Sequence, residues 1–425
     1  MHTVDTPPHT HTCCPPAASL SLSLCRVLSL CVCVFVRLSL SFALSLSLSV
    51  SVHLSLSVSL SLFVCVCASL PPRPRPRALS ASPSRAHRWI AHAALHHTKL
   101  GPRTITNNTR RFRRYNLDMS KPQADDDTAG LEVLKVKEVL NFDGSLYETR
   151  RVFATAPDKR QVPISLVYRK DLFEGGKQTA VPTMLYGYGS YGINIDPAFD
   201  AKLLPYLDRG MLYAIAHIRG GGEMGRGWYE DEGKYLCKRN TFTDFVACAE
   251  HLIDEGYTKP EVLAMEGRSA GGLLMGAVLN IRPDLFTVAL AGVPFVDVMN
   301  TMCDPSIPLT TGEWEEWGNP NEHKYFDYML SYSPYDNVRA QPYPNIMITA
   351  GLHDPRVAYW EPAKWSSKIR NLKTNGNEVL AKYDLDSGHF SASDRYKYLR
   401  EKAWEQAYVL SKVGLADAVK RPSTQ

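Results

Sequence analysis

Short apolar runs alternate with longer amphipathic stretches from residue 183 to about residue 413, and this pattern constrains the fold more than any other feature. The apolar runs are TMLYGYG, MLYAIAHI, EVLAMEG, TVALAGV, NIMITAG and EVLAKYD. Such runs are typical of strands that are buried on both faces of a parallel sheet. The amphipathic stretches lie around Phe242–Glu255, Gly271–Asn280, Glu361–Leu372 and Asp394–Val413. The alternation therefore predicts an α/β fold with a doubly wound, mostly parallel sheet.

The residues before this alternation have two different patterns. Leu131–Val139 and Tyr147–Thr155 favour strands and are separated by the turn-rich NFDGS, while VPISLVYRK follows the polar APDKR, so we expect a short antiparallel meander. Residues 1–118 hold SLSLSL and CVCV repeats and then the basic PPRPRPR and RRFRRYNLD, which predicts a disordered extension. We therefore divide the chain into an extension at 1–118, a meander linker at 119–180 and an α/β domain at 181–417.

The extension has the composition of translated dinucleotide repeats, because CT, GT and CA repeats encode alternating Leu and Ser, Val and Cys, and His and Thr. Met119 is then a plausible native start. A signal peptide or membrane segment is the alternative, but Arg37 and His53 interrupt the apolar run and nearly every second residue is Ser. We expect no membrane association.

The net charge of +5 averages two unlike segments. Residues up to Asp118 carry 13 bases and two acids, which leaves 35 bases and 41 acids in the rest of the chain. The folded part is therefore mildly acidic and favours cationic ligands over nucleic acid. The cysteines outside the extension are Cys237, Cys248 and Cys303, whose odd number and wide spacing predict reduced thiols and a cytoplasmic location.

The sequence MEGRSAGG places a GxSxG motif directly after a predicted strand and before a predicted helix. Such a tight turn needs glycine, because larger side chains would collide with the neighbouring backbone. Ser269 would then project into a cleft as a nucleophile, with the Ala270 amide facing the oxyanion that its attack creates. A Gly-rich turn capped by serine is the structural alternative, and the strand and helix on either side favour the nucleophile.

Partners for Ser269 follow in the order acid and then histidine, as an α/β-hydrolase fold requires. Asp354 lies where a buried strand ends in the loop of ITAGLHDPRV, and His389 lies in DLDSGHF after the last predicted strand. A neutral imidazole can take the serine proton and pass it to a leaving amine. Neither an HExxH pair nor a complete phosphate-binding loop occurs, so we expect no metal and no cofactor.

The chain from about Glu148 onward resembles the prolyl oligopeptidase family of serine peptidases. The resemblance rests on LYGYGSYG, HIRGGGEMGRGW, NTFTDF, GRSAGG, RPDLF, LTTGEWEEWGNP, YSPYDNV, GLHDPRV and SGHF, in that order. It implies a triad of Ser269, Asp354 and His389. It also implies that the Tyr188 hydroxyl joins the Ala270 amide at the oxyanion, and that Arg356 binds the substrate backbone.

The motif GEWEEWG indicates the specificity that this resemblance implies. Glu313 occupies the position where proline-specific relatives hold an aromatic ring, and Glu315 lies two residues further on. Two carboxylates on a pocket floor would pair with Arg or Lys, which predicts cleavage of short basic peptides after these residues. An esterase shares the motif and the fold, but acidic side chains do not suit a fatty acyl chain.

Full-length members of the family carry a β-propeller, and no blade repeats occur between Met119 and Tyr186. We therefore expect a catalytic domain without the propeller, and three readings stay open. The chain is an active peptidase without a gate, an inactive or unstable fragment, or a partner that binds peptides. Loss of the propeller interface would expose an apolar face and favour self-association.

Overall fold

The computed structural model describes residues 103–107, 110–117, 131–136, 138–173, 180–390 and 394–417. The chain divides into two compact units, 1–80 and 81–425, and all the described residues lie in the second unit. The predictions for residues 1–102 and for Met119 lie outside the described residues.

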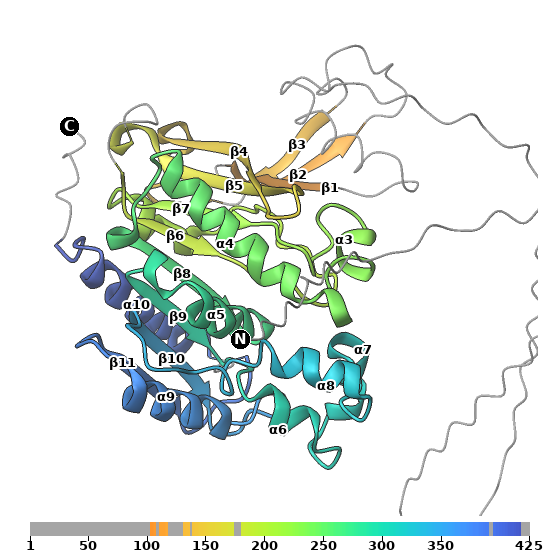
Figure 1. Cartoon of the computed structure of the whole chain (residues 1–425). Coiled ribbons are helices and arrows are strands. Elements are labelled where there is room, and N and C mark those ends of the chain that lie inside the picture. The colour runs from red at the N-terminus through yellow and green to blue at the C-terminus, as the bar shows by residue number, and fades with distance from the viewer. Residues whose placement is uncertain are drawn as a thin grey trace, which may run out of the picture. The chain divides into compact units, whose positions relative to one another are not determined.

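Eight strands form one sheet in the order β11-β10-β9-β8-β6-β7-β5-β4 (Figure 1). Their bounds are Tyr147–Thr155 (β4), Gln161–Arg169 (β5), Thr183–Tyr186 (β6), Leu212–Ala216 (β7), Leu263–Arg268 (β8), Val288–Gly292 (β9), Asn345–Gly351 (β10) and Val379–Asp384 (β11). Strands β6 to β11 pair in parallel, whereas β5 is antiparallel to both β4 and β7. The predicted α/β fold with a mostly parallel sheet is confirmed.

Helices cover both faces of this sheet. The α-helices are Leu204–Leu207 (α2), Gly227–Glu230 (α3), Arg239–Asp254 (α4), Ala270–Ile281 (α5), Val298–Met302 (α6), Thr310–Trp317 (α7), His323–Leu330 (α8), Trp360–Leu372 (α9) and Arg395–Lys412 (α10). Helices α4, α5 and α9 contribute to one apolar core, and α2 and α10 contribute to a second. Neighbouring strand residues divide between the two cores, as Met265 and Ala264 of β8 do, because side chains alternate across a strand.

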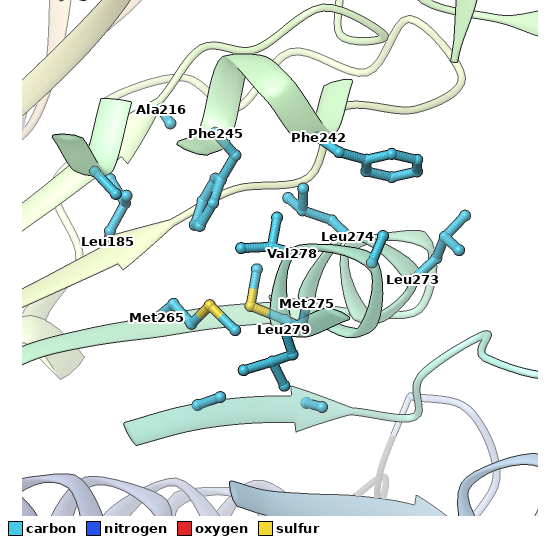
Figure 2. Packing of buried hydrophobic residues seen from close by; sticks show 14 of the residues in the cluster. Leu185, Ala216, Phe242, Phe245, Met265, Leu273, Leu274, Met275, Val278 and Leu279 are labelled. Atoms are coloured by element: carbon cyan, nitrogen blue, oxygen red, sulfur yellow. The ribbon is translucent and has the colours of Figure 1, made fainter. Parts of the chain in front are cut away.

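Helix α5, which follows Ser269, is buried along almost its whole length. Figure 2 shows Phe242 and Phe245 of α4 on one side of α5, and Met265 of β8 beside it. A fully buried side chain of this size stabilises the fold by roughly 1.5–3 kcal/mol. The element that begins at Ser269 is therefore fixed by the main core of the domain.

The predicted meander is confirmed in part, because β4 and β5 pair antiparallel, whereas the first expected strand pairs elsewhere. Strands β1 (Arg103–Asn107), β2 (Arg110–Leu117) and β3 (Leu131–Val136) form a separate antiparallel sheet, so two strands lie within the segment that we expected to be disordered. Strand β5 also pairs with β7, so the β4–β5 hairpin belongs to the main sheet. Seven consecutive residues of β5 are buried, which requires cover on both faces, and the two apolar cores on either side of the main sheet supply it. The sheet therefore crosses the expected boundary at residue 180.

Helices α7 and α8 have no counterpart in the sequence prediction.

The cysteines Cys237, Cys248 and Cys303 are free thiols. Within the described residues, none of the helices combines the length and the apolar character that crossing a bilayer requires.

Candidate active site

Ser269 lies at a strained corner between β8 and α5. Its backbone has φ 57° and ψ −117°, outside the regions that most residues with a side chain adopt. A Cβ atom on Gly267 would lie 2.2 Å from the Gly271 carbonyl oxygen, and one on Gly271 would lie 3.0 Å from the Gly187 carbonyl oxygen. The glycines of the motif are therefore needed for close backbone approach, as the sequence analysis predicts for a tight turn.

The helix that follows this corner starts at Ala270, which lines the same cavity as Ser269. Amides in the first turn of a helix have no acceptor four residues earlier within the helix, and the helix dipole places partial positive charge there. The arrangement suits an anionic oxygen that forms next to Ser269.

Asp354 and His389 lie close together at the carboxyl ends of β10 and β11. The Asp354 Oδ2 atom is 2.7 Å from His389 Nδ1, while Asp354 Oδ1 accepts hydrogen bonds from the amides of Arg356 at 2.8 Å and Val357 at 2.9 Å. The Asp354 side chain is only 1% exposed. The carboxylate is thus fixed by the loop backbone on one side and by the imidazole on the other.

The environment of Asp354 favours its ionised form. Burial alone would raise its pKa, but the hydrogen bond to His389 and the two backbone amides outweigh burial and lower the pKa below its ordinary value. A carboxylate that stays ionised can hold the proton on His389 Nδ1 and leave Nε2 as an acceptor.

The loop that carries His389 packs tightly on the end of β10. A Cβ atom on Gly351 would lie 2.5 Å from the Ser387 carbonyl oxygen, and the His353 amide donates to that same oxygen at 3.1 Å. His353 itself is exposed and serves this contact through its backbone. Ser269 and His389 line one cavity. The hydrogen bond that the imidazole makes among the described residues is the one to Asp354.

The cavity has a volume of about 680 Å³ and brings together most of the residues singled out in the sequence. Its walls include Tyr188, Tyr191, Ser269, Ala270, Phe295, Glu313, Trp317, Arg356 and His389. They come from strand ends, from α7 and from the loop after β6, which are far apart in the sequence.

Tyr188 and Arg356 border this cavity in different ways. Burial is the main cause that raises the pKa of Tyr188 to about 12, so its hydroxyl stays a neutral donor near pH 7. Arg356 is exposed, and its guanidinium carbon lies 5.4 Å from the centre of the Phe390 ring. It therefore presents a positive charge at the mouth of the cavity.

Glu313 and Glu315 do not lie together on a pocket floor. Glu313 lines the cavity, where its Oε2 atom accepts hydrogen bonds from the Tyr191 hydroxyl at 2.7 Å and the Trp317 indole at 3.1 Å. Glu315 is exposed, and its carboxylate accepts a hydrogen bond from the Tyr235 hydroxyl at 3.2 Å. The segment is helix α7, and residues two apart on a helix point in different directions. The structure thus brings only Glu313 to the cavity.

Sequence reasoning missed two residues at this side of the site, Tyr191 and Glu316. Tyr191 follows Tyr188 in LYGYGSYG, so its position in that motif was the available signal. Glu316 is 2% exposed and lies behind the cavity wall, where Tyr191 N–H donates to its Oε1 atom at 3.1 Å. Without the helix assignment, nothing marked Glu316 as buried and Glu315 as exposed.

No group of His, Cys, Asp and Glu side chains suited to a metal ion occurs in the part of the chain that the structure describes.

Comparison with known proteins places these residues in a family context. Residues 197–416, just over half of the chain, match Peptidase_S9, the prolyl oligopeptidase family. The chain is 50% identical over 274 residues to Protease 2 of Moraxella lacunata, a match that covers 64% of this chain and 39% of that protein.

Two solved structures of oligopeptidase B are also similar. The one from Leishmania major has 59% identity and a TM-score of 0.69, and covers 74% of this chain and 43% of its own. The one from Trypanosoma brucei, with covalently bound antipain, has 64% identity and a TM-score of 0.70 at the same coverage. The chain thus spans about two fifths of the length of these relatives.

Proposed function

Because the chain belongs to the prolyl oligopeptidase family, we propose that it is a serine-type endopeptidase that cleaves peptide bonds after Arg and Lys. The observation that carries the proposal is one cavity lined by Ser269, His389 and Glu313, with Asp354 hydrogen-bonded to His389. An attacking group, a proton carrier and a recognition charge are then within reach of one bound peptide.

The reaction proceeds through an acyl-enzyme. The Ser269 oxygen attacks the scissile carbonyl carbon while His389 Nε2 takes the serine proton, and Asp354 offsets the charge of the imidazolium. The oxyanion accepts hydrogen bonds from the Ala270 amide and the Tyr188 hydroxyl. Collapse breaks the C–N bond, and His389 gives its proton to the leaving amine. Water then repeats the sequence on the ester and restores Ser269.

Glu313 selects the residue before the scissile bond. Tyr191 and Trp317 each donate to Glu313 Oε2, which fixes the carboxylate on the cavity wall. A guanidinium or ammonium group of the substrate pairs with this charge, and an acidic side chain is repelled. Arg356 at the mouth of the cavity would bind a substrate carbonyl. Glu315 is too far round α7 to share this role.

The full chain and its Ser269→Ala variant test the proposal with fluorogenic Arg, Lys and Pro peptides and with an acyl ester. Cleavage after Arg and Lys that disappears in the variant supports the peptidase. Cleavage of the ester alone favours an esterase. Absence of cleavage by a folded chain indicates a fragment or a peptide-binding partner. Self-association and a cytoplasmic location stay predictions.

A further inference from the structure

Lys238 is a buried lysine directly behind the wall that carries Tyr188. Its side chain is 1% exposed, and its Nζ atom donates to the Gly189 carbonyl at 2.6 Å and the Ser190 hydroxyl at 2.8 Å. The Nζ atom also lies 3.6 Å from Glu316 Oε1. Lys238 therefore binds the loop after β6 from the side opposite to the cavity.

Glu316 binds the same loop with one carboxylate oxygen and Tyr229 of α3 with the other. Its Oε1 atom accepts the Tyr191 amide at 3.1 Å, and its Oε2 atom accepts the Tyr229 hydroxyl at 2.6 Å. Since Glu316 belongs to α7, it connects the loop to the helix that presents Glu313. Lys238 and Glu316 thus hold three consecutive residues, Gly189 to Tyr191, by their polar groups.

This loop needs such support because its backbone is strained. Gly189 has φ +67° and Tyr191 has φ 60°, so two of three neighbouring residues adopt the left-handed region. This conformation is unfavourable for a residue with a ring side chain and persists only where the surroundings impose it. The Gly192 amide anchors the end of the loop by donating to the Gly220 carbonyl at 3.0 Å. The side chains of Lys238 and Glu316 hold residues 189–191.

The loop has its functional side chains on the opposite face. Tyr188 lines the cavity next to Ser269, and the Tyr191 hydroxyl orients Glu313. A shift of this backbone would therefore move the oxyanion donor and the recognition carboxylate together.

Stability alone does not explain the buried pair. Burial lowers the pKa of Lys238 to about 8, and the nearby Glu316 only partly opposes that effect. A buried ion pair whose charged form is disfavoured in this way contributes little to folding, since desolvation offsets the attraction. A role in positioning is consistent with such a pair.

We propose that Lys238 and Glu316 are positioning residues that hold the loop at residues 187–192, so that the Tyr188 hydroxyl and the Glu313 carboxylate face the same bound peptide. This inference rests on the proposed function. We call this pair, Lys238 and Glu316, the clamp. Catalytic rate and preference for a basic side chain are then coupled, because the clamp positions the groups that determine both. A misplacement of about 1 Å lowers the rate by roughly 100-fold.

The test compares the full chain with Glu316→Gln, Lys238→Met and the milder Tyr229→Phe. Two properties are measured, namely hydrogen exchange of the peptide that spans residues 187–192 and kcat/KM for matched Arg and norleucine substrates. We expect faster exchange in this peptide, a lower kcat and a smaller ratio of Arg to norleucine cleavage, with the smallest changes in Tyr229→Phe.

Asn280→Ala is the matched control. Asn280 is buried at the far end of α5, where its amide donates to the Pro334 carbonyl at 2.9 Å and its oxygen accepts the Tyr343 hydroxyl at 3.1 Å. Its loss lowers Tm but leaves the exchange of residues 187–192 and the substrate ratio unchanged. A lower Tm in the clamp variants without these two changes would show a merely structural role and overturn the inference.

Failure of the proposed function has a different signature, because the wild-type chain then cleaves neither substrate. In that case benzamidine, a planar cation, replaces the substrates as a probe of Glu313, with binding measured by calorimetry and Glu313→Ala as the reference. Weaker benzamidine binding together with faster exchange in Glu316→Gln supports the clamp. Unchanged exchange or unchanged binding refutes it.

Discussion

The corner at Ser269 and the loop at residues 187–192 face one cavity, but they are held in different ways. The corner is shaped by backbone, since Gly267 admits the Gly271 carbonyl and the core fixes α5. The loop has backbone hydrogen bonds at both ends, but its middle residues 189–191 are bound by the side chains of Lys238 and Glu316. One cavity therefore combines geometry that a short motif encodes with geometry that side chains distant in the sequence impose.

The largest expected effect comes from Asp354→Asn, because this carboxylate is fixed by the backbone of its own loop. An asparagine can keep the acceptor contacts to the Arg356 and Val357 amides, but its NH₂ group would face His389 Nδ1 and favour the wrong tautomer. We expect kcat to fall on the order of 10⁴-fold with little change in Tm. Steady-state kinetics and thermal unfolding check this, and a kcat within tenfold of the wild type would show that the triad assignment is wrong.

The part of the site around Ser269, Asp354 and His389 could be predicted almost completely from the sequence. The strand runs, GRSAGG and the order of Ser269, Asp354 and His389 predicted which loops meet, because strand ends of a parallel sheet share one edge. These signals are local, so each can be read from a few consecutive residues.

The contacts of α7 and Lys238 with the loop at residues 187–192 could not be predicted from the sequence, because they depend on which way each helix face points and on long-range contacts. Glu313, Glu315 and Glu316 look alike in GEWEEWG, yet in α7 the first lines the cavity, the second is exposed and the third is buried. Lys238 meets Glu316 only through the fold. The strands β1 and β2 were missed for another reason, since a basic composition concealed the sheet that they form, in which β2 pairs with both β1 and β3.

A pair of matched variants, Glu313→Gln and Glu315→Gln, sharpens the distinction between the faces of α7. Hydrogen bonds to charged groups contribute about 1.5–3 kcal/mol, so Glu313→Gln lowers kcat/KM for Arg substrates by about 10- to 100-fold relative to norleucine substrates. Glu315→Gln removes an exposed charge and changes this ratio by less than about twofold. Equal losses in both variants would mean that both carboxylates meet the substrate.

The smallest effect concerns Glu361 of α9, which holds a third segment of the cavity wall. Its Oε2 atom accepts the amides of Val296 and Asp297, each at 3.0 Å, and its Oε1 atom accepts the Thr301 hydroxyl at 2.7 Å. Burial is the main cause that raises its pKa to about 7, and these hydrogen bonds only partly oppose burial. The charge of Asp297 raises the pKa further, while Lys364 pairs with Asp297.

Because the pKa of Glu361 is higher in the folded chain than its ordinary value of 4.5, the folded state binds this proton more tightly. The resulting stability is complete below about pH 4.5 and is lost as pH rises through about 7. Glu361→Gln keeps an acceptor for the two amides but does not titrate, so it gains stability relative to the wild type between pH 5 and pH 8. Denaturant unfolding across this range measures the difference. Asn280→Ala gives a constant offset, and a constant offset for Glu361→Gln as well would mean that Glu361 does not titrate in this range.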